Sequence, residues 1–527
     1  MRSIFALIAG LWFAVQSFAQ TNQPRRVEIE TRSNADQMHV VPVASEGVIL
    51  FTEAQPGKYT FTRYTTDLKE DWTVDCIVNS TLNLNKYVYR DKALYLLFNR
   101  YKSPNYQVIK LNVRAGFAEK YEFFSLDRLD IIDFDAMGTN AFIAGRTRNE
   151  PVLLHVNLPA KKARLLPSAF KSRTEIQSLT VDTLTRTLHA TFVEGKTRNK
   201  KNVIVKTFTP AGEPVRNLAL SAEGQKEYDL LNGKLSALGD SVELVIGTYG
   251  TQGPVYARAT TYNYFGYGWG STYQGTADYS QGIYISKFQG GQQNFLKYYS
   301  FTDFKNFFQF MGDKQRERME SRINRRKSQG RDLRLQYRLL VHDIIERNGQ
   351  YIMVAEAYYP EYRTNYNSMY PGPWGWGYGH GGFGGMPYNR NTPIFDGWVY
   401  THAVIAGFDH QGKLLWDNSF EISDVKTFSL REKVKVSFDN ENLMLAYNHK
   451  GELKTKVIRG REVLEAKENV PISTEYQGDR VRKSYTDEIE YWYGNNFLAW
   501  GYQKIRNDSN EQVRGRRSVF YFTKVGF

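Results

Sequence analysis

The sequence is poor in the residues and patterns on which many functions depend. Its 527 residues include a single cysteine, Cys76, which excludes a disulfide framework, a multi-cysteine metal site and an iron–sulfur cluster. The 8 histidines are scattered, and the sequence has no Gly-x-Ser-x-Gly elbow, no P-loop, no His-Glu-x-x-His and no Gly-x-Gly-x-x-Gly at a strand–helix junction. Beyond the first residues no apolar run approaches the ~18 that a membrane-spanning helix needs. We therefore expect no transmembrane segment, no resident metal and no cofactor, with a carboxylate-bound Ca²⁺ as the one alternative.

Aromatic side chains, glycine and positive charge are abundant instead. The chain has 36 Tyr, 32 Phe, 9 Trp and 42 Gly, and its 69 Lys+Arg against 55 Asp+Glu give a formal net charge of +14. With 41% hydrophobic and 24% charged residues, the composition is that of a folded protein and not of a disordered one. Little helical periodicity is visible, which favours an all-β fold.

Residues 1–19 have the pattern of a signal peptide. Arg2 supplies the positive start, Ile4–Val15 is an uncharged apolar core, and Ser17 and Ala19 place small residues before a cleavage point at Gln20. We expect an exported protein, periplasmic or extracellular. A buried N-terminal strand is the alternative.

Short apolar runs recur along the rest of the chain. Successive runs lie 46 to 54 residues apart except at two longer steps, as at Val48, Leu94, Phe142 and Leu188. A strand precedes several of these runs, and a strand of period two and a further strand follow, with Gly, Pro, Asn and Asp at the turns. This spacing matches a four-stranded propeller blade of ~40–50 residues.

Eight such units can be counted, so residues 20–527 are predicted to form one domain, a β-propeller of eight four-stranded antiparallel blades. The last unit ends at Phe527 on its third strand. The alternating segment Arg26–Thr31 is predicted to complete that blade and close the ring, which leaves only short, protected sheet edges. Seven blades, or two packed β-sandwich domains, are the alternatives.

One unit resembles the quinoprotein-type propeller repeat. The resemblance rests on Ala406–Trp416, and Thr65–Trp72 loosely repeats its tryptophan spacing. It implies the repeat architecture and carries no quinone cofactor or catalytic residue over to this chain.

Three long insertions interrupt the repeat, at residues 250–281, 301–332 and 359–397. In a blade whose strands alternate in direction, connections of these kinds leave from one face, so we expect all three on the same face of the propeller. The first and third are rich in Gly, Tyr and Trp, whose flat rings with polar tips suit sugar rings, peptides or protein surfaces. The alternative is that these loops pack on each other as a lid or stay disordered. The predicted ligand-binding residues are Tyr264, Tyr267, Trp269, Tyr273, Trp374, Trp376 and Tyr378.

The second insertion is strongly basic. Between Lys314 and Arg338 there are ten basic residues and three acidic ones, a local charge of +7. Lys314–Lys327 consists of good helix formers, with Met319 and Ile323 as a thin apolar stripe, and predicts a short helix. It is either a solvated helix or a dock for an anionic surface or polymer. The predicted anion-docking residues are Arg318, Arg322, Arg325 and Arg326.

Acidic residues recur at the start of the first strand of several units. Two of them, Asp343 and Glu488, are weak candidates for acid–base chemistry at a central channel, although such recurrence is typical of a structural position. Asp133-Phe134-Asp135 is interpreted as a strand end and turn. We therefore expect a binding or scaffold protein for a glycan, peptide or envelope partner, without specific nucleic-acid binding. A polysaccharide hydrolase or lyase is the alternative.

Overall fold

The fold is taken from a computed structural model of the whole chain. It describes residue 23 and residues 25–31, 38–148, 150–167, 174–196, 200–222, 228–238, 242–251, 280–330, 337–364, 393–510 and 513–527. The predicted signal peptide lies outside the described residues. The chain divides into two compact units, Ala35–Val434 and the pair of segments Met1–Asn34 and Lys435–Phe527. The single-domain prediction stays a prediction.

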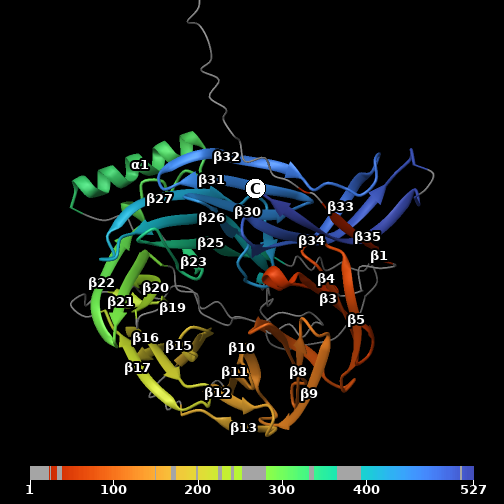
Figure 1. Cartoon of the computed structure of the whole chain (residues 1–527). Helices are drawn as coiled ribbons and strands as arrows, with labels where there is room; N and C mark the ends of the chain where they lie inside the picture. The colour runs from red at the N-terminus through yellow and green to blue at the C-terminus, as the bar shows by residue number, and fades with distance from the viewer. Residues whose placement is uncertain are drawn as a thin grey trace, which may run out of the picture. The chain divides into compact units, whose positions relative to one another are not determined.

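The unit Ala35–Val434 contains six antiparallel sheets, which follow one another in chain order (Figure 1). In the fifth and sixth sheets the first strand is split in two, and β28 adds to the sixth. The sheets are β2 (Met38–Pro42), β3 (Val48–Gln55), β4 (Lys58–Tyr64) and β5 (Glu70–Ile77); β6 (Asn83–Arg90), β7 (Ala93–Asn99), β8 (Asn105–Asn112) and β9 (Phe117–Phe124); β10 (Asp130–Met137), β11 (Asn140–Thr147), β12 (Glu150–Asn157) and β13 (Lys162–Leu165); β14 (Thr174–Asp182), β15 (Thr187–Lys196), β16 (Lys200–Phe208) and β17 (Pro214–Leu220); β18 (Tyr228–Leu230), β19 (Lys234–Ala237), β20 (Val242–Thr251), β21 (Gly282–Gln289) and β22 (Gln292–Ser300); and β23 (Arg338–Val341), β24 (Ile345–Arg347), β25 (Gln350–Thr364), β26 (Pro393–Phe408), β27 (Leu414–Glu421) and β28 (Lys426–Thr427).

The other unit contains two four-stranded sheets. The second is assembled from both ends of the chain, because the N-terminal strand β1 pairs along β35 from Arg26↔Thr523 to Glu30↔Val519. The sheets are β29 (Lys435–Asp439), β30 (Asn442–His449), β31 (Glu452–Arg459) and β32 (Glu462–Pro471); and β33 (Arg480–Tyr493), β34 (Asn496–Arg506), β35 (Arg516–Gly526) and β1 (Arg26–Glu30).

These sheets confirm an all-β propeller of eight four-stranded antiparallel blades, with the last blade completed by the N-terminal strand. Three helical segments accompany them in the described part of the chain, η1 (Ala44–Glu46), η2 (Phe301–Asp303) and α1 (Asp313–Ser328). Of the helices in the described ranges, none has the length and apolarity to cross a membrane.

The recurring apolar runs are the second strands of the blades. Every residue of β7 is buried, because each face of an inner sheet packs on a neighbouring blade and both faces therefore need apolar side chains. One core cluster joins Ile49 and Phe51 of the first blade to Leu94 and Leu96 of the second. The cores thus lie between successive sheets.

Carboxylates connect neighbouring blades where the sequence predicted a turn. Asp133 and Asp135 lie within β10 and accept backbone N–H bonds from Leu179 and Val181 of β14, at 2.8 and 3.1 Å. The interpretation of residues 133–135 as a strand end and turn is therefore wrong. Burial raises the pKa of Asp133, and the hydrogen bonds from the next blade act against that rise. The two carboxylates thus supply hydrogen-bond acceptors for backbone N–H groups that apolar side chains could not satisfy.

Glycines in several turns receive a side chain from the preceding blade. A Cβ at Gly116 would lie 3.0 Å from the Trp72 ring, and one at Gly412 would lie 2.4 Å from the Phe295 ring. Trp416 instead covers Gly407 of its own blade. The two tryptophans of the quinoprotein-like stretches thus make different contacts, and that resemblance stays a prediction.

Gly412→Ala is expected to destabilise the protein more than Gly290→Ala. Both glycines have positive φ, +73° and +59°, but nothing lies within 4 Å of a Cβ at Gly290. Left-handed strain alone costs about 1–2 kcal/mol, and the clash with Phe295 adds about 1–3 kcal/mol at Gly412. Denaturant unfolding of the two variants measures the difference. Equal losses of stability would show that the contact between residue 412 and Phe295 does not hold the two blades together.

Candidate functional site

Helix α1 begins one residue before the predicted helix and ends one residue after it. Asp313 lies in its first turn, and Arg325, Arg326 and Lys327 lie in its last turn. This arrangement complements the helix dipole, since anionic groups are favourable at the N-terminus and cations at the C-terminus. The short helical insertion is therefore confirmed.

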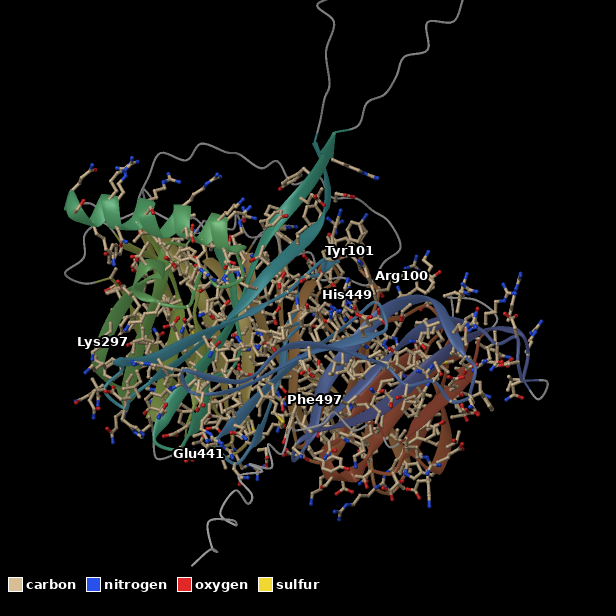
Figure 2. The ribbon with its side chains drawn as sticks, turned by 90° about the horizontal axis from the view of Figure 1, so that it is seen from above. Arg100, Tyr101, Lys297, Glu441, His449 and Phe497 are labelled. Carbon is tan, nitrogen blue, oxygen red and sulfur yellow. The ribbon has the colours of Figure 1, made fainter. Side chains whose placement is uncertain are left out.

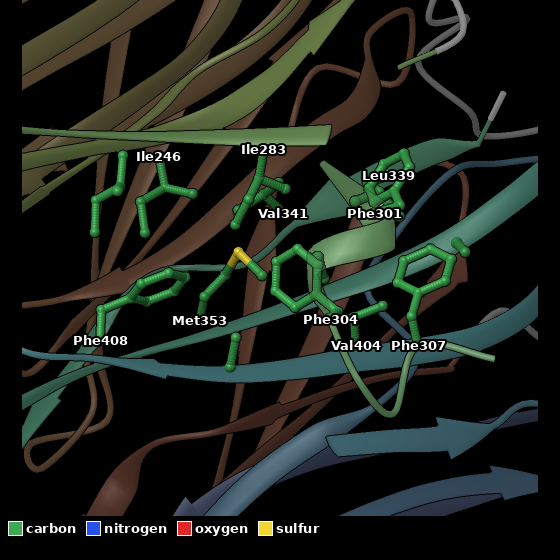
Figure 3. Close-up of a cluster of buried hydrophobic side chains, with 14 of the residues drawn as sticks. Ile246, Ile283, Phe301, Phe304, Phe307, Leu339, Val341, Met353, Val404 and Phe408 are labelled. Atoms are coloured by element: carbon green, nitrogen blue, oxygen red, sulfur yellow. The ribbon is translucent and has the colours of Figure 1, made fainter. Parts of the chain in front are cut away.

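An aromatic segment before α1 packs into the core cluster between the fifth and sixth blades (Figure 3). Ile323, the buried residue of α1, belongs to a core cluster that contains Phe301, Phe304 and Phe307, and Met319 packs against the same cluster. In the segment before the helix, Ser300 and Asp303 form a capping box at η2. The helix therefore lies on a rigid aromatic base.

The base is also held by polar contacts with the sixth blade. Asp417 accepts the backbone N–H groups of Lys305 and Asn306, at 3.0 and 2.6 Å. Phe310 stacks on His402 of β26 with ring centroids 3.8 Å apart. Burial lowers the pKa of His402 to about 3, so this histidine is neutral and acts as part of the aromatic packing.

Four of the exposed cations of α1 lie together on one side of the helix. At about 100° per residue, Lys314, Arg318, Arg322 and Arg325 lie within about 80° of one another, on the side away from Ile323. We call these four residues the basic ridge. They are exposed, and they span about 16 Å of helix. The acidic residues Asp313, Glu317 and Glu320 lie together on a flank.

The basic ridge has no carboxylate partner among the residues that the structure describes. Within α1, Arg316 forms an ion pair with Asp313 at 2.7 Å. Arg326, predicted as an anion-docking residue, is partly buried and lies off the ridge, whereas Lys314 lies on it. The heptad-like spacing of the basic residues, i, i+4, i+8 and i+11, would have shown this from the sequence.

Strands β25 and β26 continue beyond the blade as a two-stranded ribbon. The pairing extends from Tyr359↔Val399 to Thr364↔Pro393, so the predicted insertion 359–397 begins as paired strands. Four rings gather here, and the centroid of the Phe395 ring lies 5.0 to 6.4 Å from the centroids of the other three. We call them the aromatic patch: Tyr362, Phe395, Trp398 and Phe428.

Charged groups border the aromatic patch. Lys426 donates hydrogen bonds to Glu361, at 2.7 Å, and to Asp396. A hydrogen bond from Lys426 lowers the pKa of Asp396, and burial acts against this shift. Arg338 lies over the Trp398 ring at 5.9 Å. The patch therefore offers apolar ring faces beside both hydrogen-bond donors and acceptors.

The basic ridge and the ribbon lie on the same side of their unit (Figure 2). The sheet register gives the reason, because Tyr249, Gly282 and Ser300 are aligned across three neighbouring strands. The insertion after β20 and the one after β22 therefore leave from the same end of the fifth sheet. In the sixth sheet, Arg338 at the start of β23 pairs with Tyr358 near the point where the ribbon begins.

The seven aromatic residues predicted as ligand-binding lie outside the described residues. We did not predict Phe395, Trp398 or Phe428 as ligand-binding residues, because they fall at or beyond the edge of the predicted loop. For Phe395 and Trp398 the signal was the run of large apolar residues within 394–400 that leads into the strand pattern of the blade, whereas no pattern singles out Phe428. The predicted site residues in question are Tyr264, Tyr267, Trp269, Tyr273, Trp374, Trp376 and Tyr378.

The two candidate catalytic carboxylates have different surroundings. Asp343 is exposed, lies between β23 and β24, and pairs with Lys234 at 3.1 Å, which also pairs with Glu432 at 3.2 Å. Glu488 is the ninth residue of β33, in the other unit. Neither residue opens its strand, contrary to expectation. Within the described ranges no three His, Cys, Asp or Glu side chains are grouped to hold a metal. The hydrolase or lyase alternative stays a prediction.

Comparisons with known proteins return only distant folds. No family model and no curated protein matches the chain. One similar solved structure is that of a polysaccharide lyase, 7% identical with a TM-score of 0.39, over 84% of this chain and 89% of that one. A prolyl endopeptidase is 7% identical with a TM-score of 0.37, and the match spans 84% of this chain and 50% of the endopeptidase. An uncharacterised protein from Listeria monocytogenes is 9% identical with a TM-score of 0.30, over 52% and 69%. These similarities are too low to bear on activity.

Proposed function

We propose that this protein is an exported binding or scaffold protein that recognises an anionic glycan, peptide or cell-envelope partner through the basic ridge and the aromatic patch. The observation that carries the proposal is the basic ridge. Four cations lie on one exposed side of a helix, and an aromatic base holds that helix in place. The acidic residues of α1 are exposed as well, but they lie on a flank of the helix and not among the ridge cations.

The physical basis of recognition is a fixed row of like charges. Aligned cations attract an anionic partner over about one Debye length and release its counterions on contact. Arginine adds bidentate hydrogen bonds to carboxylate, sulfate or phosphate groups. Because Ile323 and Met319 pack the helix on the core cluster, binding does not have to order the backbone that carries the ridge.

The test is charge reversal on the ridge. Arg318→Glu, Arg322→Glu and Arg325→Glu together are expected to weaken binding of anionic polymers by about 100-fold. Wild-type affinity is expected to fall at least about tenfold between about 50 and about 200 mM salt. Fluorescence anisotropy with labelled polygalacturonate and polyglutamate measures both quantities.

A matched control carries the same change in net charge elsewhere. Lys69→Glu, Lys162→Glu and Lys413→Glu replace exposed lysines of the same unit that lie away from α1. This variant is expected to bind as the wild type does, apart from a small nonspecific loss. If it loses as much affinity as the ridge variant, overall charge and not the ridge governs binding, and the proposal fails.

A further inference from the structure

The aromatic patch has a specific chemical character. Phe428 is 74% exposed and Tyr362 is 45% exposed, whereas aromatic side chains are usually mostly buried. The rings meet edge to face, at interplanar angles of 63° to 76°. Several ring faces thus remain available to a ligand.

We infer that the ligand of this surface is an acidic polysaccharide built from uronic acid units. This inference rests on the proposed function and names the ligand class. The C–H faces of the sugar rings stack on the aromatic patch, and the carboxylates along the same polymer contact the basic ridge.

The surroundings of the aromatic patch favour a sugar over a peptide. Sugar rings carry apolar C–H faces with hydroxyl groups around the rim, and these hydroxyls both donate and accept hydrogen bonds. Glu361 and Asp396 supply acceptors at the edge of the patch, and Lys426 supplies a donor. A ring platform bordered by both kinds of group matches that chemistry.

The ridge itself argues against a membrane surface. An interfacial helix inserts an apolar face among the lipids, but the apolar residues of α1, Met319 and Ile323, pack inward on the core cluster. The exposed residues of α1 are polar or charged. The exposed surface of the helix therefore offers a partner polar and charged groups and no apolar face.

One polymer can occupy both features because they lie on one side of the same unit (Figure 2). The ridge spans about 16 Å along its axis, long enough to contact several sugar units of one chain. Once the ridge holds the polymer, stacking on the patch becomes an intramolecular step with a high effective concentration. The two contacts then reinforce each other.

The experiment compares ring variants on polymers that differ in one property. The probes are polygalacturonate, its methyl ester, which keeps the sugar rings and lacks the charge, polyglutamate, which keeps the charge and lacks the sugar rings, and vesicles of phosphatidylglycerol and phosphatidylcholine. The test variant is Tyr362→Ala with Phe428→Ala. Its control is Phe117→Ala with Leu184→Ala, two apolar side chains that are 61% and 77% exposed at turns at the other end of their sheets. All four residues are exposed, so both variants are expected to fold.

The expected result is a loss of about tenfold in affinity for polygalacturonate in the test variant, with polyglutamate binding and the control variant unchanged. The methyl ester and the vesicles are expected to bind at least about tenfold more weakly than polygalacturonate. Unchanged polygalacturonate binding in the test variant would overturn the inference. So would polyglutamate or vesicles binding as tightly as polygalacturonate. In each of these cases the proposed function still holds if charge reversal on the ridge weakens binding. The proposed function fails if the ridge variant binds no more weakly than its charge-matched control.

Discussion

Arg517→Met is expected to lower the free energy of unfolding by about 3–5 kcal/mol, the usual cost of leaving buried charge without its partner. Arg517 lies on β35 and contacts Asp479 at 2.5 Å and Glu28 of β1 at 3.0 Å. The three side chains are 3%, 0% and 5% exposed. Without the guanidinium, two buried carboxylates face each other with too few donors.

The same contacts attach the N-terminal strand. Glu28 also accepts from Arg26 at 2.8 Å, and Arg26 donates to Gln503 of β34 and lies over the Tyr521 ring. We therefore expect Arg517→Met to loosen β1 before the rest of the blade. Faster amide exchange in residues 26–30 than in β34 would show this.

Chemical denaturation measures the loss, and Arg516→Met is the control. Arg516 is the exposed neighbour on the same strand, so its replacement is expected to change stability by less than about 0.5 kcal/mol. Arg517→Lys keeps the charge without the two-pronged contact and is expected to lie between the two. Equal stability of the 516 and 517 variants would mean that the buried charges do not hold β1.

Glu356→Ala is the second change with a large expected effect, a loss of about 3–5 kcal/mol. Glu356 is fully buried on β25. Its Oε1 accepts three hydrogen bonds, from His342 at 2.9 Å and from the backbone N–H groups of Lys433 and Val434 at 2.8 and 2.7 Å. Alanine leaves these donors without an acceptor and opens a cavity as well.

A graded series tests this account. Glu356→Gln keeps an oxygen acceptor of the same shape and is expected to cost about 1–2 kcal/mol. Glu346→Ala removes an exposed carboxylate from the same blade, which lies 3.9 Å from His410, and is expected to cost less than about 0.5 kcal/mol. Calorimetric unfolding gives the order. A Glu356→Ala variant as stable as Glu356→Gln would contradict the role of the oxygen as the shared acceptor.

The blades were predictable because their signal is local. A strand buried on both faces, such as Leu94–Phe98, produces a continuous apolar run, and turns between such strands carry Gly, Asn and Asp. The helix at Lys314–Lys327 was predictable for the same reason. The row of cations on α1 also follows from the spacing, and the anion-docking role of Arg326 stays a prediction.

The buried polar contacts were not predictable from the sequence. Arg517 and Glu28 are 489 positions apart, and Glu356 and Val434 are 78 apart. No local pattern distinguishes such residues from exposed ones, because only the packing of distant strands makes them partners. Asp133 and Asp135 were misinterpreted for the same reason, since acidic residues in an exposed turn and acidic acceptors between blades look alike in sequence.

Modification of arginine by phenylglyoxal, mapped residue by residue with and without polygalacturonate, tests the central claim most directly. The account predicts that the polymer protects Arg318, Arg322 and Arg325, while exposed Arg186, elsewhere on the same unit, reacts at an unchanged rate. Saturating polymer that leaves the three ridge arginines as reactive as before would contradict it.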